Sequence, residues 1–141
     1  DRAMTAEELA HSETIPKVCI VGPPSGSGHI GVRYFTPQNA HGSLAVSGGC
    51  CLAAATLIPG SVAHELAQGL PPVPREFAEV DVGIENPAGV LEATIEARLL
   101  GSGLELRKAA YRRSTQILMR GQVPLYRASR PLHDALLPLC G

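Results

Sequence analysis

The segment from Cys50 to Ile58 constrains the fold more than any other part of the chain. It reads CCLAAATLI, so every residue except Thr56 is apolar and none carries a charge. A helix that is apolar on all sides is buried inside its domain rather than lying on a surface. Ser47 is a favourable N-cap residue, and Pro59-Gly60 ends the segment. We therefore expect a helix over residues 48–58 with no face exposed to solvent.

Short runs of alternating or β-branched residues surround this helix and predict strands. They cover residues 15–21, 29–35, 77–84, 89–99, 104–112 and 122–126. Such an order of elements is neither a succession of βαβ units nor a plain sandwich. We expect an α+β fold in which a strongly curved mixed β-sheet is wrapped round a central apolar helix.

The two ends of the chain differ from this domain. Residues 1–14 are typical of a linker, or of a helix end, that follows a missing N-terminal half, and Thr5 with Glu8 predicts a capping box there. Residues 15–126 form the predicted domain, in which 114–120 read as a short helical turn. The tail 127–141 is expected to be either disordered or packed as a short helix.

Composition excludes several classes of function. The 12 Lys and Arg residues nearly balance the 13 Asp and Glu residues, and no basic stripe interleaved with aromatics exists, so nucleic-acid binding is not expected. No apolar run approaches the roughly 18 residues of a membrane span, and no signal-peptide pattern occurs, which favours a cytoplasmic setting.

The cysteines do not predict a metal or disulfide site. The four residues are Cys19, Cys50, Cys51 and Cys140, without a C-x-x-C spacing. We expect them to be small buried apolar residues in a reducing compartment. No metal, nucleotide or other cofactor is expected.

The start of the apolar helix is the candidate site. Ser47, Gly48 and Gly49 follow a loop that contains His41 and Ser43. Free N–H groups at a helix start attract carboxylates or phosphates, and glycine lets an anion approach the backbone. An ordinary N-cap with small residues for tight packing remains the alternative.

Three separated motifs occur along the chain. The first lies in residues 32–62, where a strand leads through His41 into a Gly-led, Ala-rich helix that ends in Ile-Pro-Gly-Ser-Val. The others are the Asn-Pro-Ala-Gly turn at 86–89 and the closing stretch 111–123. Together with the entry strand that begins Ile-Pro-Lys-Val at residue 15, they resemble the PrpF-type family of methylaconitate isomerases and oxalomesaconate tautomerases.

The resemblance implies one half of a diaminopimelate epimerase-like fold. That fold has two related domains, each a β-structure round a helix, with the active site in the cleft between them. The family uses no cofactor and moves a proton within an unsaturated di- or tricarboxylate. Its principal acid–base residues, a Lys and a Cys, belong to the first domain, so we expect no isomerase activity from this chain alone. Ser47 stands where epimerases have a Cys, and Cys50 and Cys51 are expected to face the core.

Three functions remain open at this point. The chain is the substrate-carboxylate-binding half of a cofactor-independent isomerase or tautomerase that needs its missing N-terminal domain. Alternatively, it is a non-catalytic half-domain that pairs with a second copy of itself and binds a small carboxylate. The third is a structural remnant without a ligand. Under the first two, the binding residues are His41, Ser47, Gly48 and Gly49, and the catalytic residues are unknown.

Overall fold

The computed structural model describes residues 3–12, 14–37, 39–101, 103–121, 126–127 and 129–137. In chain order the elements are α1 (Ala6–Ala10), β1 (Val18–Gly22), β2 (Ile30–Thr36), β3 (Asn39–Ala40), α2 (Val46–Thr56), α3 (Val62–Leu66), β4 (Ala78–Asn86), β5 (Gly89–Leu100), β6 (Gly103–Tyr111) and α4 (Arg130–Leu136).

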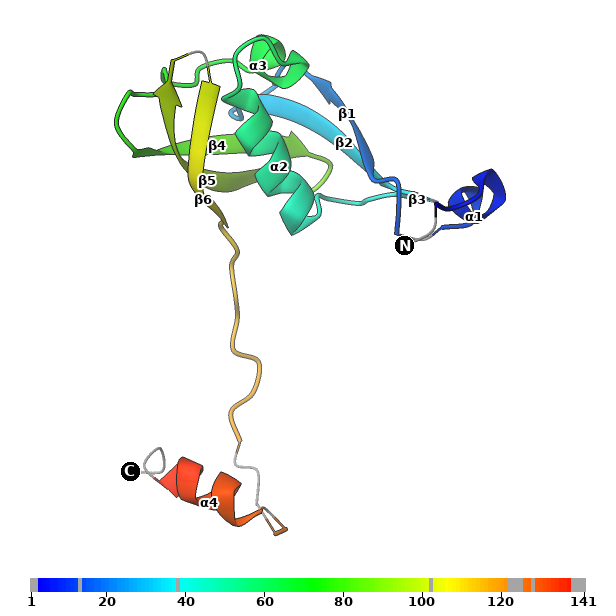
Figure 1. Ribbon diagram of the computed structural model, residues 1–141, viewed down its shortest axis with the longest axis vertical. Helices are drawn as coiled ribbons and strands as arrows, with labels where there is room; N and C mark the ends of the chain where they lie inside the picture. The colour runs from blue at the N-terminus through cyan, green and yellow to red at the C-terminus, as the bar shows by residue number, and fades with distance from the viewer. Residues whose placement is uncertain are drawn as a thin grey trace.

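The strands form one mixed sheet with the order β1-β2-β4-β5-β6, and the short β3 pairs with β2. All neighbours are antiparallel except β2 and β4, which run parallel. That parallel pairing is short and joins only Ile30 to Ile84 and Gly31 to Glu85. The sheet curls strongly and holds α2 on its concave side (Figure 1), as expected for an α+β fold of this kind.

The core lies between the concave face of the sheet and α2. Alternate residues of the three central strands point inward, as the period of two along a strand requires. The buried apolar residues are Ile30, Val32, Tyr34, Leu44, Leu52, Ala53, Leu57, Ala63, Val80, Val82, Ile84, Ala93, Ile95 and Ala97. The small side chains of α2 and β5 let the helix approach the sheet closely, since no Trp and few other aromatic residues are available to fill the space.

The expectation that α2 has no exposed face is wrong. Leu52, Ala53 and Leu57 are buried, but Cys51, on the other side of the helix, is exposed. The physical reason is that the sheet curls only part of the way round. Within the described residues, β1 and β6 are both edge strands, and nothing in the sheet closes over the outer face of α2.

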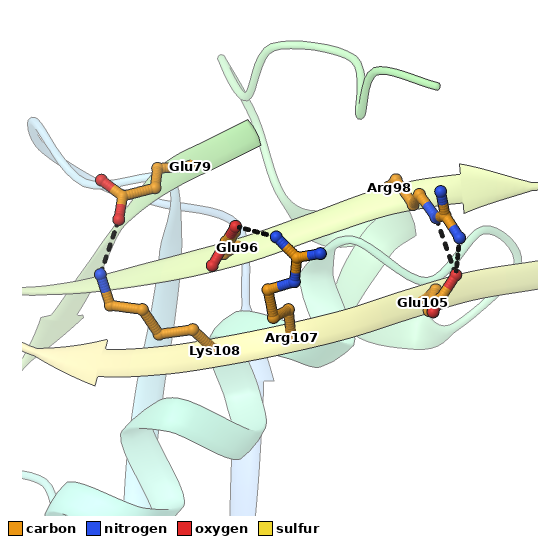
Figure 2. A network of polar contacts seen from close by, with 6 residues as sticks. All are labelled: Glu79, Glu96, Arg98, Glu105, Arg107 and Lys108. Carbon is orange, nitrogen blue, oxygen red and sulfur yellow. Dashed lines mark hydrogen bonds and ion pairs between the residues drawn. The ribbon is translucent and has the colours of Figure 1, made fainter. Parts of the chain in front are cut away.

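The convex face of β4, β5 and β6 is charged. Figure 2 shows three ion pairs across these strands: Glu79 with Lys108 at 2.7 Å, Glu96 with Arg107 at 3.2 Å, and Arg98 with Glu105 at 2.7 Å. Phe77 lies beside the guanidinium groups of Arg98 and Arg107, which are 4.4 and 4.1 Å from its ring centroid. Exposed ion pairs contribute little to stability, roughly 0–1 kcal/mol each. Their presence shows that the convex face of the sheet is exposed to water.

The ends of the chain fit the sequence in part. The capping box of α1 is confirmed, because Thr5 Oγ1 accepts from the Glu8 N–H at 3.1 Å and the Thr5 N–H donates to the Glu8 carboxylate at 2.8 Å. The helical turn predicted at 114–120 is wrong, since residues 112–121 have no regular structure.

Beyond β6, these residues run as an extended segment that leads away from the sheet toward α4 (Figure 1). The predicted strand at 122–126 lies almost wholly outside the described residues. In the described part of the chain, no helix has the length and apolar character to cross a bilayer.

Candidate functional site

Helix α2 begins one residue before Ser47, at Val46, and its N-cap is Ala45. The prediction of Ser47 as the N-cap is therefore wrong; Ser47 occupies the second helical position. No side chain of the described residues caps this helix. Because the first turn of a helix has no intrahelical acceptors, the N–H groups of Val46, Ser47 and Gly48 are left for an external one. The N–H of Gly49 is not, since it donates to the Ala45 carbonyl at 2.8 Å.

The two glycines of this turn serve tight packing. A Cβ atom built on Gly48 would lie 2.4 Å from Cε2 of Tyr34, and one built on Gly49 would lie 2.5 Å from Cε2 of Tyr111. Real Cβ atoms do not approach neighbours so closely. The packing explanation of these glycines therefore holds, and it coexists with open amides in the same turn.

A hydrogen-bonded loop leads into the helix. The His41 N–H donates to the Tyr34 carbonyl at 2.8 Å, and His41 Nδ1 accepts from the Ser43 N–H at 3.0 Å. Since Nδ1 is an acceptor, a neutral His41 ring carries its proton on Nε2. Its ring also meets the Tyr34 ring edge-on, with centroids 6.1 Å apart. The candidate residues His41 and Gly48 thus contact the same tyrosine.

Asn86 anchors this loop to the sheet. Its Oδ1 accepts from Ser43 Oγ at 3.1 Å and from the Ala88 N–H at 3.0 Å, and its Nδ2 donates to the Gly89 carbonyl at 2.8 Å. The sequence indicated only a turn at 86–89. A buried Asn after an apolar strand is the signal that could have pointed to this second role.

Sequence reasoning also missed the two tyrosines. Burial raises the pKa of both Tyr34 and Tyr111, so each stays a neutral phenol. The hydroxyl of Tyr111 is buried and has no hydrogen-bond partner among the described residues. In the sequence, both residues sit at inward positions of alternating strands, which is also where ordinary core aromatics occur.

An open, largely apolar groove of about 580 Å³ runs beside α2, between it, α3 and β1. Ser47 and Gly48 line it, as do Lys17, Cys19 and Cys51. Lys17 precedes β1 and does not lie within it, contrary to what the strand prediction 15–21 implied.

The cysteines differ from expectation. Cys19 and Cys51 are exposed and Cys50 is half-buried, and all three are free thiols. The expectation that the cysteines are small buried residues is wrong for Cys19 and Cys51, and Cys140 lies outside the described residues. Cys51 does not face the core, because the sheet leaves that face of α2 uncovered. Burial raises the pKa of the Cys19 and Cys50 thiols.

A second carboxylate-binding feature is already occupied by the chain itself. The Glu85 carboxylate accepts from the N–H groups of Ser25, Gly26 and Gly28 at 2.7, 2.7 and 2.9 Å, and from Ser25 Oγ at 2.9 Å. The backbone N–H of Ser25, followed by that of Gly28, lowers the pKa of Glu85 to about 2. The sequence analysis did not predict this feature.

The described residues do not form a metal site. Among the described residues, no group of three or more His, Cys, Asp or Glu side chains lies close enough together to hold an ion. His64 Nδ1 lies 2.8 Å from the Thr56 carbonyl, so this ring joins α3 to the end of α2.

The curved mixed sheet around one helix defines the class of protein. The same fold occurs in a crystal structure of methylitaconate-delta-isomerase, with a TM-score of 0.55 at 20% sequence identity, covering 77% of this chain and 31% of the solved one. The chain is thus an α+β half-barrel that shares the fold of part of that solved structure. It belongs to the PrpF protein family, whose model matches residues 2–126.

Curated relatives agree with this assignment. The chain is 36% identical over 111 residues to the (4E)-oxalomesaconate Delta-isomerase of Novosphingobium sp. strain KA1, covering 79% of this chain and 29% of the relative. It is 35% identical over 85 residues to the 4-oxalomesaconate tautomerase of Pseudomonas putida, covering 60% of this chain and 22% of the relative. The chain therefore spans less than a third of the length of the relatives it matches.

Proposed function

We propose that this chain is the carboxylate-binding half of an isomerase or tautomerase that acts on unsaturated di- or tricarboxylates by proton transfer. The observation that carries the proposal is the uncapped first turn of α2, where the amides of Val46, Ser47 and Gly48 have no acceptor in the helix. The positive end of the helix dipole favours an anion there. The family relationship and the names of the relatives, which act on oxalomesaconate, supply the substrate class.

The surroundings of this turn suit a multiply charged acid. Lys17 lines the same groove and adds a positive charge, and Ser47 adds a hydroxyl donor. A groove of about 580 Å³ falls within the range of small-molecule sites, roughly 300–1,000 Å³. Since Gly49 already donates within the helix, the binding residues become Ser47 and Gly48, with Val46 added and His41 beside them.

Catalysis is proposed to need a complementary domain. On its own, the chain binds the acid and does not turn it over, because its groove is open and the acid–base pair belongs to the complementary domain in this proposal. The proposed partner is the domain that the longer relatives have in addition to this one. The proposed chemistry uses no metal or organic cofactor.

The test is a titration of the isotope-labelled chain with citrate and trans-aconitate, followed through backbone amide shifts. We expect weak binding, on the order of millimolar, which corresponds to about 4 kcal/mol. The largest shifts should occur at residues 46–48 and at Lys17. Shifts confined to other parts of the chain, or none at saturating acid, would refute the proposed site.

A further inference from the structure

We propose that two copies of this chain exchange their extended segments, residues 113–121, and that each segment pairs as an added strand with the outer edge of β1 in the other copy. We refer to residues 113–121 as the arm; Arg112 is not part of it, because its N–H and its guanidinium both contact Glu92 of the same chain. The inference does not depend on the proposed function, because it concerns the edge of β1, beside which the proposed carboxylate groove runs.

The arm carries three consecutive large apolar side chains that are not buried in the single chain. Ile117 is 67% exposed, and Leu118 and Met119 are each 87% exposed. Three consecutive large apolar side chains with this exposure are uncommon on a monomer surface and mark a contact site. The arm is also extended already, with no proline among its residues, so its backbone is able to pair with a strand.

The two edges of the sheet differ in a way that selects β1 as the acceptor. The edge strand β6 carries charged residues such as Glu105, Arg107 and Lys108, which protect an edge from pairing. The other edge strand, β1, reads VCIVG and has none. Its Ile20 is 65% exposed, and beside it runs the groove toward α2 and the 64% exposed Val62 of α3. An unprotected apolar edge is a template for an added strand.

The geometry favours a second copy over the chain's own arm. β1 and β6 are at opposite ends of the strand order, and the arm leaves β6 in the direction away from the sheet (Figure 1). In a twofold dimer, each arm pairs with the β1 edge of the other copy, so both contacts form at once, as an isologous interface requires.

The experiment measures the mass of the full chain in solution by analytical ultracentrifugation over a concentration series, without any carboxylate. We expect a monomer–dimer equilibrium. Leu118→Glu in the arm and Val62→Glu beside the β1 edge should each weaken the dimer about tenfold or more in Kd. Leu132→Glu in α4 and Leu100→Glu in β5 are matched controls, because they add the same charge at exposed apolar positions outside the contact. Both should dimerise as the parent does.

Mixing the two weakened variants provides the sharper result. A heterodimer of Leu118→Glu and Val62→Glu chains keeps one intact arm on one intact edge, so the mixture should contain more dimer than either variant alone. Circular dichroism spectra of the variants should match the parent. A monomer at every concentration, a dimer that neither variant weakens, or a mixture without rescue would each overturn the proposal.

Discussion

The ring of Tyr34 occupies the space that a side chain at position 48 would need: a Cβ atom on Gly48 would lie 2.4 Å from Tyr34 Cε2 and 2.9 Å from its hydroxyl oxygen. In a helix, alanine is normally more stable than glycine by roughly 0.5–1 kcal/mol. Here the clash reverses that preference, because overpacking a core contact typically costs about 1–3 kcal/mol.

We therefore predict that Gly48→Ala lowers the free energy of unfolding by about 1–2 kcal/mol in urea denaturation. In a Tyr34→Leu background, the same substitution should be neutral or stabilising, since the ring is gone. Gly42→Ala is the control, because a Cβ there meets no atom within 4 Å. Equal effects of Gly48→Ala in both backgrounds would contradict the packing argument.

The Glu85 carboxylate makes stability depend on pH. Its pKa is lowered from an ordinary value of 4.5 to about 2, so the folded state favours the charged form. A group with a lowered folded pKa stabilises fully above its unfolded pKa and loses that contribution as the pH falls through the folded value. We predict that Glu85→Gln is less stable than the parent at neutral pH.

The difference in melting temperature between Glu85→Gln and the parent should shrink steadily from about pH 4.5 to about pH 2. Glu76→Gln, which changes an exposed carboxylate in the loop before β4, serves as the control and should show no such trend. A difference that stays constant across this range would show that the Glu85 contacts do not favour its charged form.

Ser47 allows binding and stability to be separated. A Glu at the second position of α2 places a negative charge near the positive end of the helix dipole, which stabilises a helix by roughly 0.3–1 kcal/mol. The same charge repels a carboxylate ligand. We predict that Ser47→Glu leaves the free energy of unfolding unchanged or raises it slightly. The same substitution should weaken citrate binding about tenfold or more in Kd.

Ser47→Gln has nearly the same size without the charge and should bind citrate with much less loss. Both affinities are read from the amide titration, and both stabilities from urea unfolding. If Ser47→Glu binds citrate as well as Ser47→Gln does, the anion does not lie at this turn.

Asn86 should be the residue whose loss most disturbs the loop before α2. Asn86→Ala leaves the Gly89 carbonyl and the Ala88 N–H without their partner and frees Ser43. These three bonds are half-buried, and an intramolecular hydrogen bond contributes about 0.5–1.5 kcal/mol, so we predict a loss of at least about 1 kcal/mol in the free energy of unfolding. Hydrogen exchange at residues 41–45 should also accelerate. Ser43→Ala removes one of these bonds and should have a smaller effect of the same kind.

The chain alone should not isomerise oxalomesaconate faster than buffer does. The measurement is a spectrophotometric assay at high protein concentration, with Lys17→Ala as the matched variant. A rate above buffer that Lys17→Ala abolishes would show that the groove holds a complete acid–base system. In that case the need for a second domain would be disproved.

The individual strands were predicted better from the sequence than the extent to which the sheet curls round α2. Runs such as 77–84 and 89–99 alternate, and each corresponds to a strand because one face of the sheet packs on α2. The burial of α2 was overestimated since CCLAAATLI is apolar whether or not strands surround it. How far a sheet curls depends on pairings between distant residues, and the pattern within a single segment does not contain them.

The start of α2 was predicted in place but not in detail. The segment that starts α2 is where the sequence put it, yet the helix begins at Val46 instead of Gly48, so the available amides shift by two residues toward the N-terminus. N-cap preference favoured Ser47, but the extended backbone of Ala45 starts the helix earlier. The contacts of Gly48 with Tyr34, and of Ser43 with Asn86, link positions far apart in the chain, which no local motif reveals.

The short parallel pairing of β2 with β4 divides the sheet into two plates, β1 and β2 on one side and β4, β5 and β6 on the other. Few bonds cross this line besides the pairing itself. His29 exchanges two hydrogen bonds with Gly83, at 2.7 and 2.8 Å, and Glu85 holds the loop at residues 25–28. A force that separates the plates acts on these bonds first. We therefore expect the molecule to open first between β2 and β4, while the antiparallel strand pairs on either side remain intact.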